Sequence, residues 1–324
     1  MMKSFSKEAF YAIKKAVIPA LLFLYLLLFP DTALRSARDG LVLWYRSVLP
    51  VLFPFMMVCS VTLRLELADP LLALLYRPFH FLFGCSRYGA FAILTGFLCG
   101  FPMGAKITSD LYRQEKISRR EMMFLYGFVN NLSPAFLISY VAGEQMGHPE
   151  LAFLFLVNVL GSAVLYGILS SFLYRKDIDA AYESNLPPAS RKTEDCFSVI
   201  DACISETLQN TLRLGAWIML FSILTGGIAR FCSLKNPPAL LLASCTEVTV
   251  GIRMIAASSF SFEQKYVLIN TIAAFGGLSA LAQTVGISSM DRKVTLHYIK
   301  SRVACTLLSL LLSVFTLFFR LFFL

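Results

Sequence analysis

The sequence predicts an all-α polytopic membrane protein made of two inverted-topology repeats with broken or re-entrant helices. Three observations predict this class. The 324 residues are 57% hydrophobic and 15% charged, whereas about a quarter of a soluble domain is charged. Uncharged apolar runs recur along the whole chain, and several approach the ~20 residues that cross a bilayer as a helix. A set of short motifs also recurs in the same order in the two halves.

The first region, 1–47, is predicted to hold an N-terminal transmembrane helix and an interfacial segment. Lys14 and Lys15 precede an apolar run, and no small-x-small cleavage site follows it, so we expect an uncleaved first helix. Three arginines between 31 and 47 favour a segment that lies flat at the membrane interface.

A polar stretch, 175–213, divides the chain near its middle. It contains Pro187-Pro188 and mixed charges, and it is predicted to be a cytoplasmic linker with an amphipathic helix. The two repeats then occupy 48–174 and 214–324. No strands are expected, because a barrel would show alternating segments of ~10 residues in place of unbroken apolar runs.

The repeat consists of three motifs in each half. A glycine precedes a cation by two residues, a capping box follows, and a pair of small or polar residues then stands before Leu-Ser. The matching sets are Gly104 and Lys106, Ser118 to Glu121, and Asn130-Asn131-Leu132-Ser133 in the first half, against Gly251 and Arg253, Ser261 to Gln264, and Gly276-Gly277-Leu278-Ser279 in the second.

Charge placement predicts opposite orientations for the two halves. Lys and Arg place the N-terminus and the loops 106–120 and 291–302 on the cytoplasmic side, whereas 144–150 has neither residue and is predicted outside. Tracing the apolar runs between these loops turns the second half upside down relative to the first. Inverted repeats with interrupted helices are typical of secondary transporters.

The stretch TGFLCGFPMGAK carries Gly100, Pro102 and Gly104 within an apolar run. Irregular backbone at membrane depth is tolerated where protein or a water-filled cavity surrounds it. The stretch is therefore predicted to break and line a site, although the overlapping GxxxG spacing is also explained by tight helix packing alone. Likewise, Lys106 is either a site residue or a side chain that reaches the head groups.

Polar residues inside apolar runs mark the predicted solute site. Asn130 and Asn131 are adjacent amides, and Ser133 and Pro134 directly after them strengthen the case for a break. Glu247 is an acid within an apolar run, so it is either a functional group or an interfacial one. We expect the two amides and Glu247 to converge near the bilayer midplane, with the first half supplying polar side chains. The second half then supplies room at Gly276 and Gly277, next to Ser279, with further hydrogen bonds from Thr246, Thr249 and Gln283.

Several classes of function are not supported. The net charge of +9 comes from Lys and Arg at the ends of apolar runs, which indicates lipid head groups and not nucleic acid. The eight cysteines form no CxxC and the three histidines match no zinc spacing, so no metal or other cofactor is expected. No hydrolase or nucleophile motif is present, so we expect no enzyme, with an intramembrane hydrolase based on Glu247 as a remote alternative. A homo-oligomer is left open.

The segments CGFPMGAK, FVNNLSPAF, EVTVGI and FGGLSALAQ together resemble the YlbJ family of sporulation integral membrane proteins, and more distantly the nucleoside-recognition gate domain superfamily. The resemblance runs from about Leu49 to Gln283, and GxPMGAK is its most specific element. A tyrosine is usual in the family where this chain has Phe101. The residues carried over are Gly100, Pro102, Gly104, Lys106, Asn130, Asn131, Pro134, Glu247, Gly251, Gly276, Gly277 and Gln283.

The resemblance implies a multi-pass protein of a bacterial inner, forespore or mother-cell membrane that is needed for normal spore formation. Gate-type domains occur in nucleoside transporters, ferrous-iron permeases and spore-maturation proteins. The expected function is therefore transport of a small polar solute or ion. The alternative is a scaffold or assembly factor that transports nothing.

Overall fold

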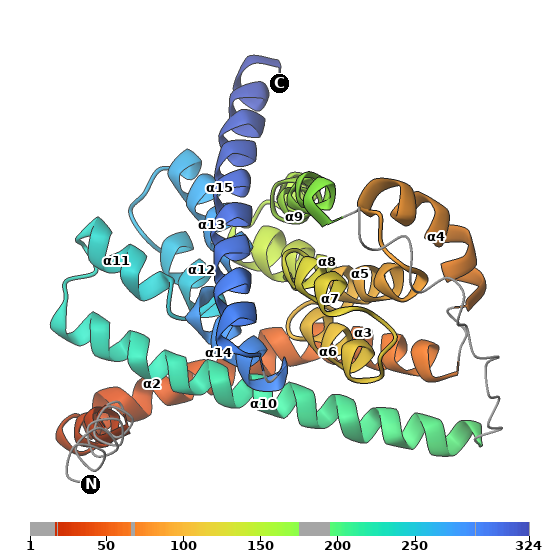
Figure 1. Cartoon of the computed structure of the whole chain (residues 1–324). Helices are drawn as coiled ribbons and strands as arrows, with labels where there is room; N and C mark the ends of the chain where they lie inside the picture. The colour runs from red at the N-terminus through yellow and green to blue at the C-terminus, as the bar shows by residue number, and fades with distance from the viewer. Residues whose placement is uncertain (1–16, 18, 66–68, 175–194, 289, 324) are drawn as a thin grey trace, which may run out of the picture.

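The computed structural model describes residues 17, 19–65, 69–174, 195–288 and 290–323 (Figure 1). Every regular element within these ranges is a helix. Five helical stretches among them are long and apolar enough to cross a membrane: Pro30–Val58, Pro149–Tyr174, Cys196–Phe231, Phe262–Gly286 and Arg292–Phe319. A sixth is formed if Tyr76–Phe83 and Arg87–Cys99, which are bent by 94°, count as one broken span. The predicted all-α polytopic class is confirmed.

Two long helical stretches lie side by side and run antiparallel (Figure 1). The first comprises α2 (Pro30–Leu43), a π-helical segment η1 (Trp44–Val48) and α3 (Leu49–Arg64), and the second is α10 (Cys196–Phe231). Small residues allow the close approach, since Gly40 faces Ser222 and Gly226 faces Ser36. Near the middle of α10, Trp44 Nε1 donates to the carbonyl oxygen of Thr211 at 3.0 Å.

The first half then contains a helical hairpin followed by a broken helix. The hairpin is α5 (Arg87–Cys99) and α6 (Met103–Arg113). A methyl group built on Gly104 would lie 3.1 Å from the Cα of Gly96, so the chain doubles back between these helices. The broken helix is α7 (Arg119–Tyr126) followed, after an irregular stretch, by α8 (Pro134–Phe136) and the π-helical η2 (Leu137–Gln145). Before and after these elements lie α4 (Asp69–Phe83), the short η3 (Pro149–Leu151) and α9 (Ala152–Tyr174).

The second half has the same order of elements. Its hairpin is α11 (Pro237–Ser244) and α12 (Val248–Ala256), and Gly251 faces the carbonyl group of Ser244 across it. Its broken helix is α13 (Phe262–Phe275) and α14 (Gly277–Ser288), followed by α15 (Arg292–Phe323). The repeated order of hairpin and broken helix is therefore present in the structure. The opposite orientation of the halves in the membrane stays a prediction.

The two predicted capping boxes differ in detail. Ser261 and Gln264 form a reciprocal box at the start of α13. In the first half Ser118 accepts from the backbone N–H of Glu121, but the Glu121 carboxylate accepts from the N–H of Ser86 at 2.8 Å instead. Glu121 thereby joins the start of α7 to the start of α5, because Ser86 is the N-cap of α5.

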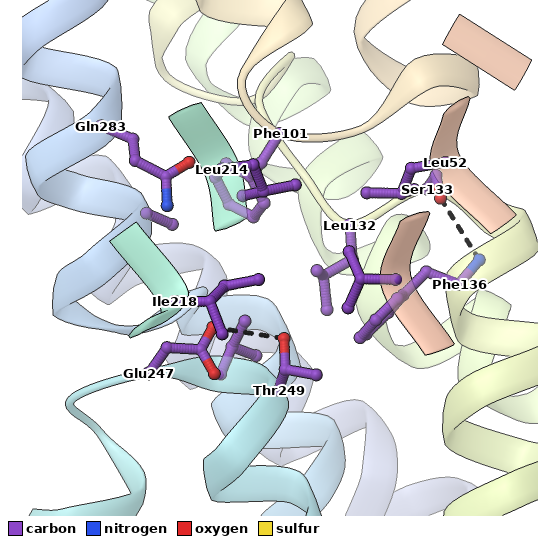
Figure 2. A pocket seen from close by; sticks show the side chains of 13 residues that line it. Leu52, Phe101, Leu132, Ser133, Phe136, Leu214, Ile218, Glu247, Thr249 and Gln283 are labelled. Carbon is purple, nitrogen blue, oxygen red and sulfur yellow. Dashed lines mark hydrogen bonds between the residues drawn. The ribbon is translucent and has the colours of Figure 1, made fainter. Parts of the chain in front are cut away.

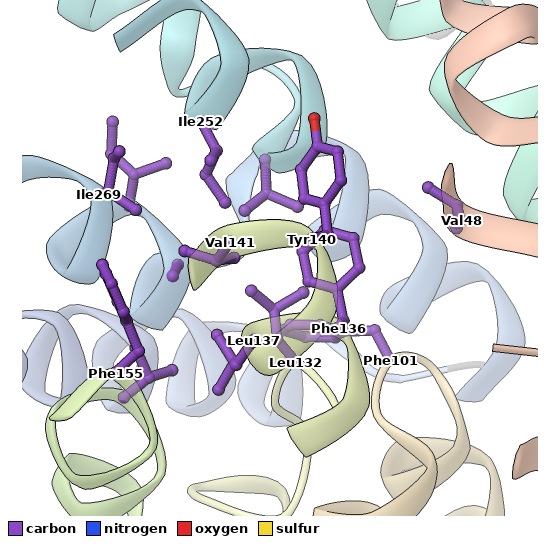
Figure 3. Packing of buried hydrophobic residues seen from close by; sticks show 14 of the residues in the cluster. Val48, Phe101, Leu132, Phe136, Leu137, Tyr140, Val141, Phe155, Ile252 and Ile269 are labelled. Atoms are coloured by element: carbon purple, nitrogen blue, oxygen red, sulfur yellow. The ribbon is translucent and has the colours of Figure 1, made fainter. Parts of the chain in front are cut away.

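A hydrophobic core joins the two halves (Figure 3). Leu137 and Val141 of η2 lie in the same buried cluster as Phe155 of α9, Ile252 of α12 and Ile269 of α13. This packing places the second half of one broken helix against the hairpin of the other repeat, and so fixes the two repeats relative to each other.

Three boundaries differ from the sequence predictions. The expected interfacial segment before 48 is part of the continuous stretch Pro30–Val58; the π-helical turn keeps the helix unbroken, and its buried face packs on α10. The expected boundary at 213/214 lies inside α10, since Gly215 alone does not interrupt a helix that packs along α2. The expected loop 291–302 is helical from Arg292 onward. Residues 1–16, 18 and 175–194 lie outside the described residues, and Pro19–Leu28 is a shorter apolar helix.

Candidate functional site

A pocket lies where the two hairpin tips meet the two broken helices (Figure 2). Its volume is about 40 Å³, which is room for a few water molecules. Residues from both repeats and from α3 and α10 line it: Val48, Leu52, Phe101, Leu132, Ser133, Phe136, Leu214, Ile218, Glu247, Val248, Thr249, Ala280 and Gln283. Four predicted site residues, Ser133, Glu247, Thr249 and Gln283, are therefore brought together.

The tip of the first hairpin is Gly100-Phe101-Pro102. Gly100 has a φ of +77°, and a methyl group built on it would lie 2.7 Å from the backbone nitrogen of Ser133. Only glycine fits both the backbone conformation and the close approach. The peptide bond between Phe101 and Pro102 is cis. The Phe101 ring lines the pocket and also faces Gly276.

The tip of the second hairpin carries the one charged side chain among the described residues that line the pocket. Glu247 is 2% exposed and is the N-cap of α12. Its carboxylate accepts from the N–H of Val250 at 2.7 Å and from Thr249 Oγ1 at 3.2 Å. A carboxylate at a helix N-terminus is stabilised by the orphan N–H groups and by the helix dipole. Glu247 therefore lies buried at the pocket.

Backbone hydrogen bonds join the second tip to the second broken helix. The N–H groups of Leu278 and Ser279 donate to the carbonyl oxygens of Cys245 and Thr246, both at 2.9 Å. Gly276 and Gly277, with φ of +84° and +80°, form the break. A methyl group on Gly277 would lie 2.9 Å from the nitrogen of Val248. The predicted site residues Gly276, Gly277 and Ser279 thus shape the contact between the second hairpin tip and the second broken helix. We call this contact, and its counterpart in the first half, a crossing.

The side chains of Gln283 and Ser133 complete the polar lining of the pocket. Gln283, one turn after Ser279 in α14, donates from Nε2 to Ser279 Oγ at 3.0 Å. Ser133 is the N-cap of α8 and accepts from the N–H of Phe136 at 3.2 Å, and Pro134 follows as the first residue of that helix. Opposite these groups the walls are aliphatic and aromatic. Such a surface can hold a small molecule with one or two polar groups, an ion or water.

The predicted convergence of Asn130 and Asn131 with Glu247 is wrong. The Asn130 amide donates to Thr284 Oγ1 at 2.8 Å and to the Tyr298 hydroxyl at 3.0 Å. Asn131 accepts from Arg302 Nη1 at 3.0 Å and donates to the carbonyl oxygen of Phe128 at 2.6 Å. Both amide side chains therefore hold the break between α7 and α8 in place. Their sequence spacing to Ser133 did not reveal this, because Arg302 approaches from more than 170 residues away.

Lys106 also lies outside the pocket. Its ammonium group pairs with Glu206 of α10 and with Asp110 at 3.5 Å, and Arg64 of α3 binds the same Glu206 at 2.7 Å. Neither prediction for Lys106 was a helix-to-helix ion pair. The pairing follows from α10, which extends past the predicted boundary and brings Glu206 to the start of α6.

Gly104 and Gly251 act as packing residues of the hairpins. A methyl group on Gly104 would lie 2.3 Å from the carbonyl oxygen of Val129, and one on Gly251 would lie 2.2 Å from that of Ser244. For these two glycines the packing alternative therefore describes what the structure shows. The residues that sequence reasoning missed are the apolar walls and Arg302, whose only signal was a cation near a loop.

Comparison with known proteins identifies one similar protein. The sporulation integral membrane protein YlbJ of Bacillus subtilis (strain 168) is 26% identical over 299 residues, which cover 80% of this chain and 71% of that protein. No family model and no solved structure matches the chain. The chain is thus similar to a sporulation integral membrane protein, and this similarity together with its apolar spanning helices supports a multi-pass membrane location.

Proposed function

We propose that this protein is a gate-type transporter or permease of a sporulating bacterium, and that the pocket at the helix breaks is the passage for a small polar solute or ion. The observation that supports the proposal is the composition of that pocket. Hairpin tips and broken helices from both halves line one cavity, and the single carboxylate in it comes from a hairpin tip.

Physical reasoning supports this interpretation over a purely structural one. Breaking helices within a membrane protein leaves backbone groups that must find partners, so breaks are retained where they line a cavity. Transporters with repeated halves place their sites at such breaks near the repeat interface. A scaffold has no need for a buried carboxylate, carboxamide and hydroxyl groups around one cavity.

The small volume of the pocket suits a closed state of the proposed passage. A volume of about 40 Å³ is far smaller than the ~300–1,000 Å³ of ordinary ligand pockets. Phe101, Leu132 and Phe136 fill much of the space around it (Figure 2). Under this proposal the small pocket represents a closed state, and transport requires the hairpin tips to separate from the broken helices.

Glu247→Gln tests the proposal. The variant keeps the size and the acceptor oxygen of the cap but removes the charge in the pocket. Glu263→Gln is the matched control, because Glu263 is exposed in the first turn of α13. Each variant replaces the resident copy in sporulating cells, and membrane abundance is measured by immunoblot.

We expect normal abundance for both variants, and a loss of heat-resistant spores for Glu247→Gln alone. Metabolites and metals measured separately in mother cells and forespores should shift for Glu247→Gln as they do for a deletion strain. A deletion strain with a spore defect and no difference in any small solute would instead support the alternative, a scaffold or assembly factor.

A further inference from the structure

Arg302 is the largest fully buried side chain of the described residues, with 0% exposure. It lies on α15, which contributes no residue to the pocket lining. Among the described residues no acidic side chain forms an ion pair with it. A buried cation inside a membrane protein is costly, so such residues serve a specific purpose.

The guanidinium group binds backbone oxygens that the break of α7 leaves without helical partners. Nη2 donates to the carbonyl oxygen of Gly127 at 2.9 Å, and Nη1 donates to that of Asn130 at 2.8 Å. Nη1 also donates to Asn131 Oδ1 at 3.0 Å. The C-terminal end of a helix carries a partial negative charge, which stabilises a cation there. The broken end of α7 therefore takes the place of a counter-ion.

The neighbours of Arg302 extend this network to two further elements, α14 and α6. Its guanidinium carbon lies 5.8 Å from the centre of the Tyr298 ring. The Tyr298 hydroxyl accepts from the Asn130 amide, which also binds Thr284 of α14. Asn130 Oδ1 accepts from the N–H of Ala105 in α6 at 3.4 Å. The unwound stretch 127–131 is thus held from α6, α14 and α15 at once.

We infer that Arg302 is a positioning residue of the pocket: it keeps 127–131 unwound and thereby presents Leu132 and Ser133 to the cavity. These two residues follow the held stretch directly and line the pocket. Without the guanidinium group, rewinding of the backbone brings the N–H of Asn131 to the freed carbonyl oxygen of Gly127, and Leu132 turns away. The inference deepens the proposed function and rests on it for its biological meaning.

The test is the reactivity of a cysteine reporter, Leu132→Cys, toward a small water-soluble thiol reagent in purified full-length protein. The labelled fraction at position 132 is read by peptide mass spectrometry, so the native cysteines stay in place. The variants compared are Arg302→Gln, Arg302→Lys and the control Lys300→Gln, which removes an exposed positive charge from the same helix. Only protein that elutes as a folded species is labelled.

We expect the labelling rate to fall about tenfold for Arg302→Gln, the effect of losing one charge-assisted hydrogen bond, and to fall less for Arg302→Lys. Lysine keeps the charge but lacks the planar fork that reaches two carbonyl groups. A merely structural role would lower the yield and the Tm and leave the rate in the folded fraction unchanged.

A rate within about twofold of the control, a margin well below one hydrogen bond, or a rate that rises, would overturn the inference. If Arg302→Gln yields no folded protein, Arg302→Lys decides by the same criterion, since it keeps a cation in the buried position. The reporter needs no solute to move, so this outcome is separate from that of the transport test.

Discussion

At the two crossings of hairpin and broken helix, the backbone groups that the break exposes find their hydrogen-bond partners in different ways. In the first half the break spans several residues between α7 and α8, and its carbonyl groups are bound by Arg302 and by the Asn131 side chain. In the second half the break is short, and backbone N–H groups of Leu278 and Ser279 pair directly with the hairpin tip.

This difference determines which half supplies chemistry to the pocket. In the first half the side chains of Asn130 and Asn131 hold the helix break in place, so Ser133 is the one polar residue that this half contributes to the pocket lining. The second half needs no side chains for its crossing and leaves Glu247, Thr249 and Gln283 at the cavity. The structure therefore reverses the division expected from sequence, in which the amides of the first half served the solute.

The hairpins also differ in how they attach to α10. The first is joined by the ion pair of Lys106 with Glu206, and the second by a hydrogen bond between the hydroxyl groups of Thr246 and Thr225. One attachment depends on charge and the other does not. The comparison can therefore be tested by salt as well as by mutation.

The largest effect is expected at the first hairpin. Gly104→Ala places a methyl group 2.3 Å from the Val129 carbonyl oxygen, and backbone must move to admit it. We expect a loss of about 3 kcal/mol in the free energy of unfolding, measured in mixed micelles titrated with SDS. Gly161→Ala is the control, because its methyl group would have 4.0 Å to the nearest atom. Equal stability of the two variants would show that the close approach of α5 and α6 is unimportant.

Leu278→Pro tests the backbone pairing of the second crossing. Position 278 lies in the first turn of α14, where proline fits a helix, so the main loss is the N–H that binds Cys245. We expect a loss of about 1–3 kcal/mol in the free energy of unfolding. Glu263→Pro, at the equivalent position of α13, should lose far less. A similar loss for both would assign the effect to proline and not to the crossing.

Glu206→Gln tests the charged attachment of the first hairpin. The three partners Lys106, Glu206 and Arg64 are 25%, 27% and 42% exposed, so solvent screens the pairs, and we expect a loss of only about 1 kcal/mol. The loss should shrink at high salt. For a Thr246→Val variant, the loss should not depend on salt. Asp201→Asn, exposed on the same helix, is the control for the removed charge.

The smallest effect is expected for the ion pair that joins the repeats near α7 and α15. The N–H of Val294 and the guanidinium group of Arg119 hold the pKa of Asp291 below its ordinary value of 3.8. A depressed pKa adds stability above the unfolded-state value and loses it as the pH falls through the folded-state value. The Tm of Asp291→Asn should therefore lie slightly below wild type at neutral pH and converge with it below pH 3.8. A gap that persists in acid would point to lost packing.

Much of the fold could be predicted from patterns of residues that are close together in the chain. Apolar runs predicted the spanning helices, and the matched motifs marked both hairpin tips, since glycines that must admit another backbone have few substitutes. Glu247 was also found, because an acid in an apolar run stands out. These features depend on residues close together in the chain.

Contacts between distant segments were not predictable in this way. The sequence indicated only a loop cation at Arg302, because its partners lie about 170 residues earlier. Asn130 and Asn131 were predicted as site residues because the sequence does not reveal the distant side chains that they bind. The predicted domain boundary at 213/214 was wrong because α10 continues through it: the polar first part of this helix packs along α3, and Glu206 in that part pairs with Arg64. Apolar walls such as Leu214 and Ile218 resemble any lipid-facing residue until the fold places them at the pocket.

The central claim, that the pocket is a passage for solute, is tested most directly by its access to water. Ala280→Cys places a thiol in the pocket lining, and Ala163→Cys places one in a packed cluster away from it, and both alanines are buried. A charged, membrane-impermeant thiol reagent is applied to intact cells and to inverted vesicles, and labelling is read by peptide mass spectrometry. The account predicts that Ala280→Cys is labelled from at least one side and Ala163→Cys from neither. Failure to label Ala280→Cys from either side would contradict it.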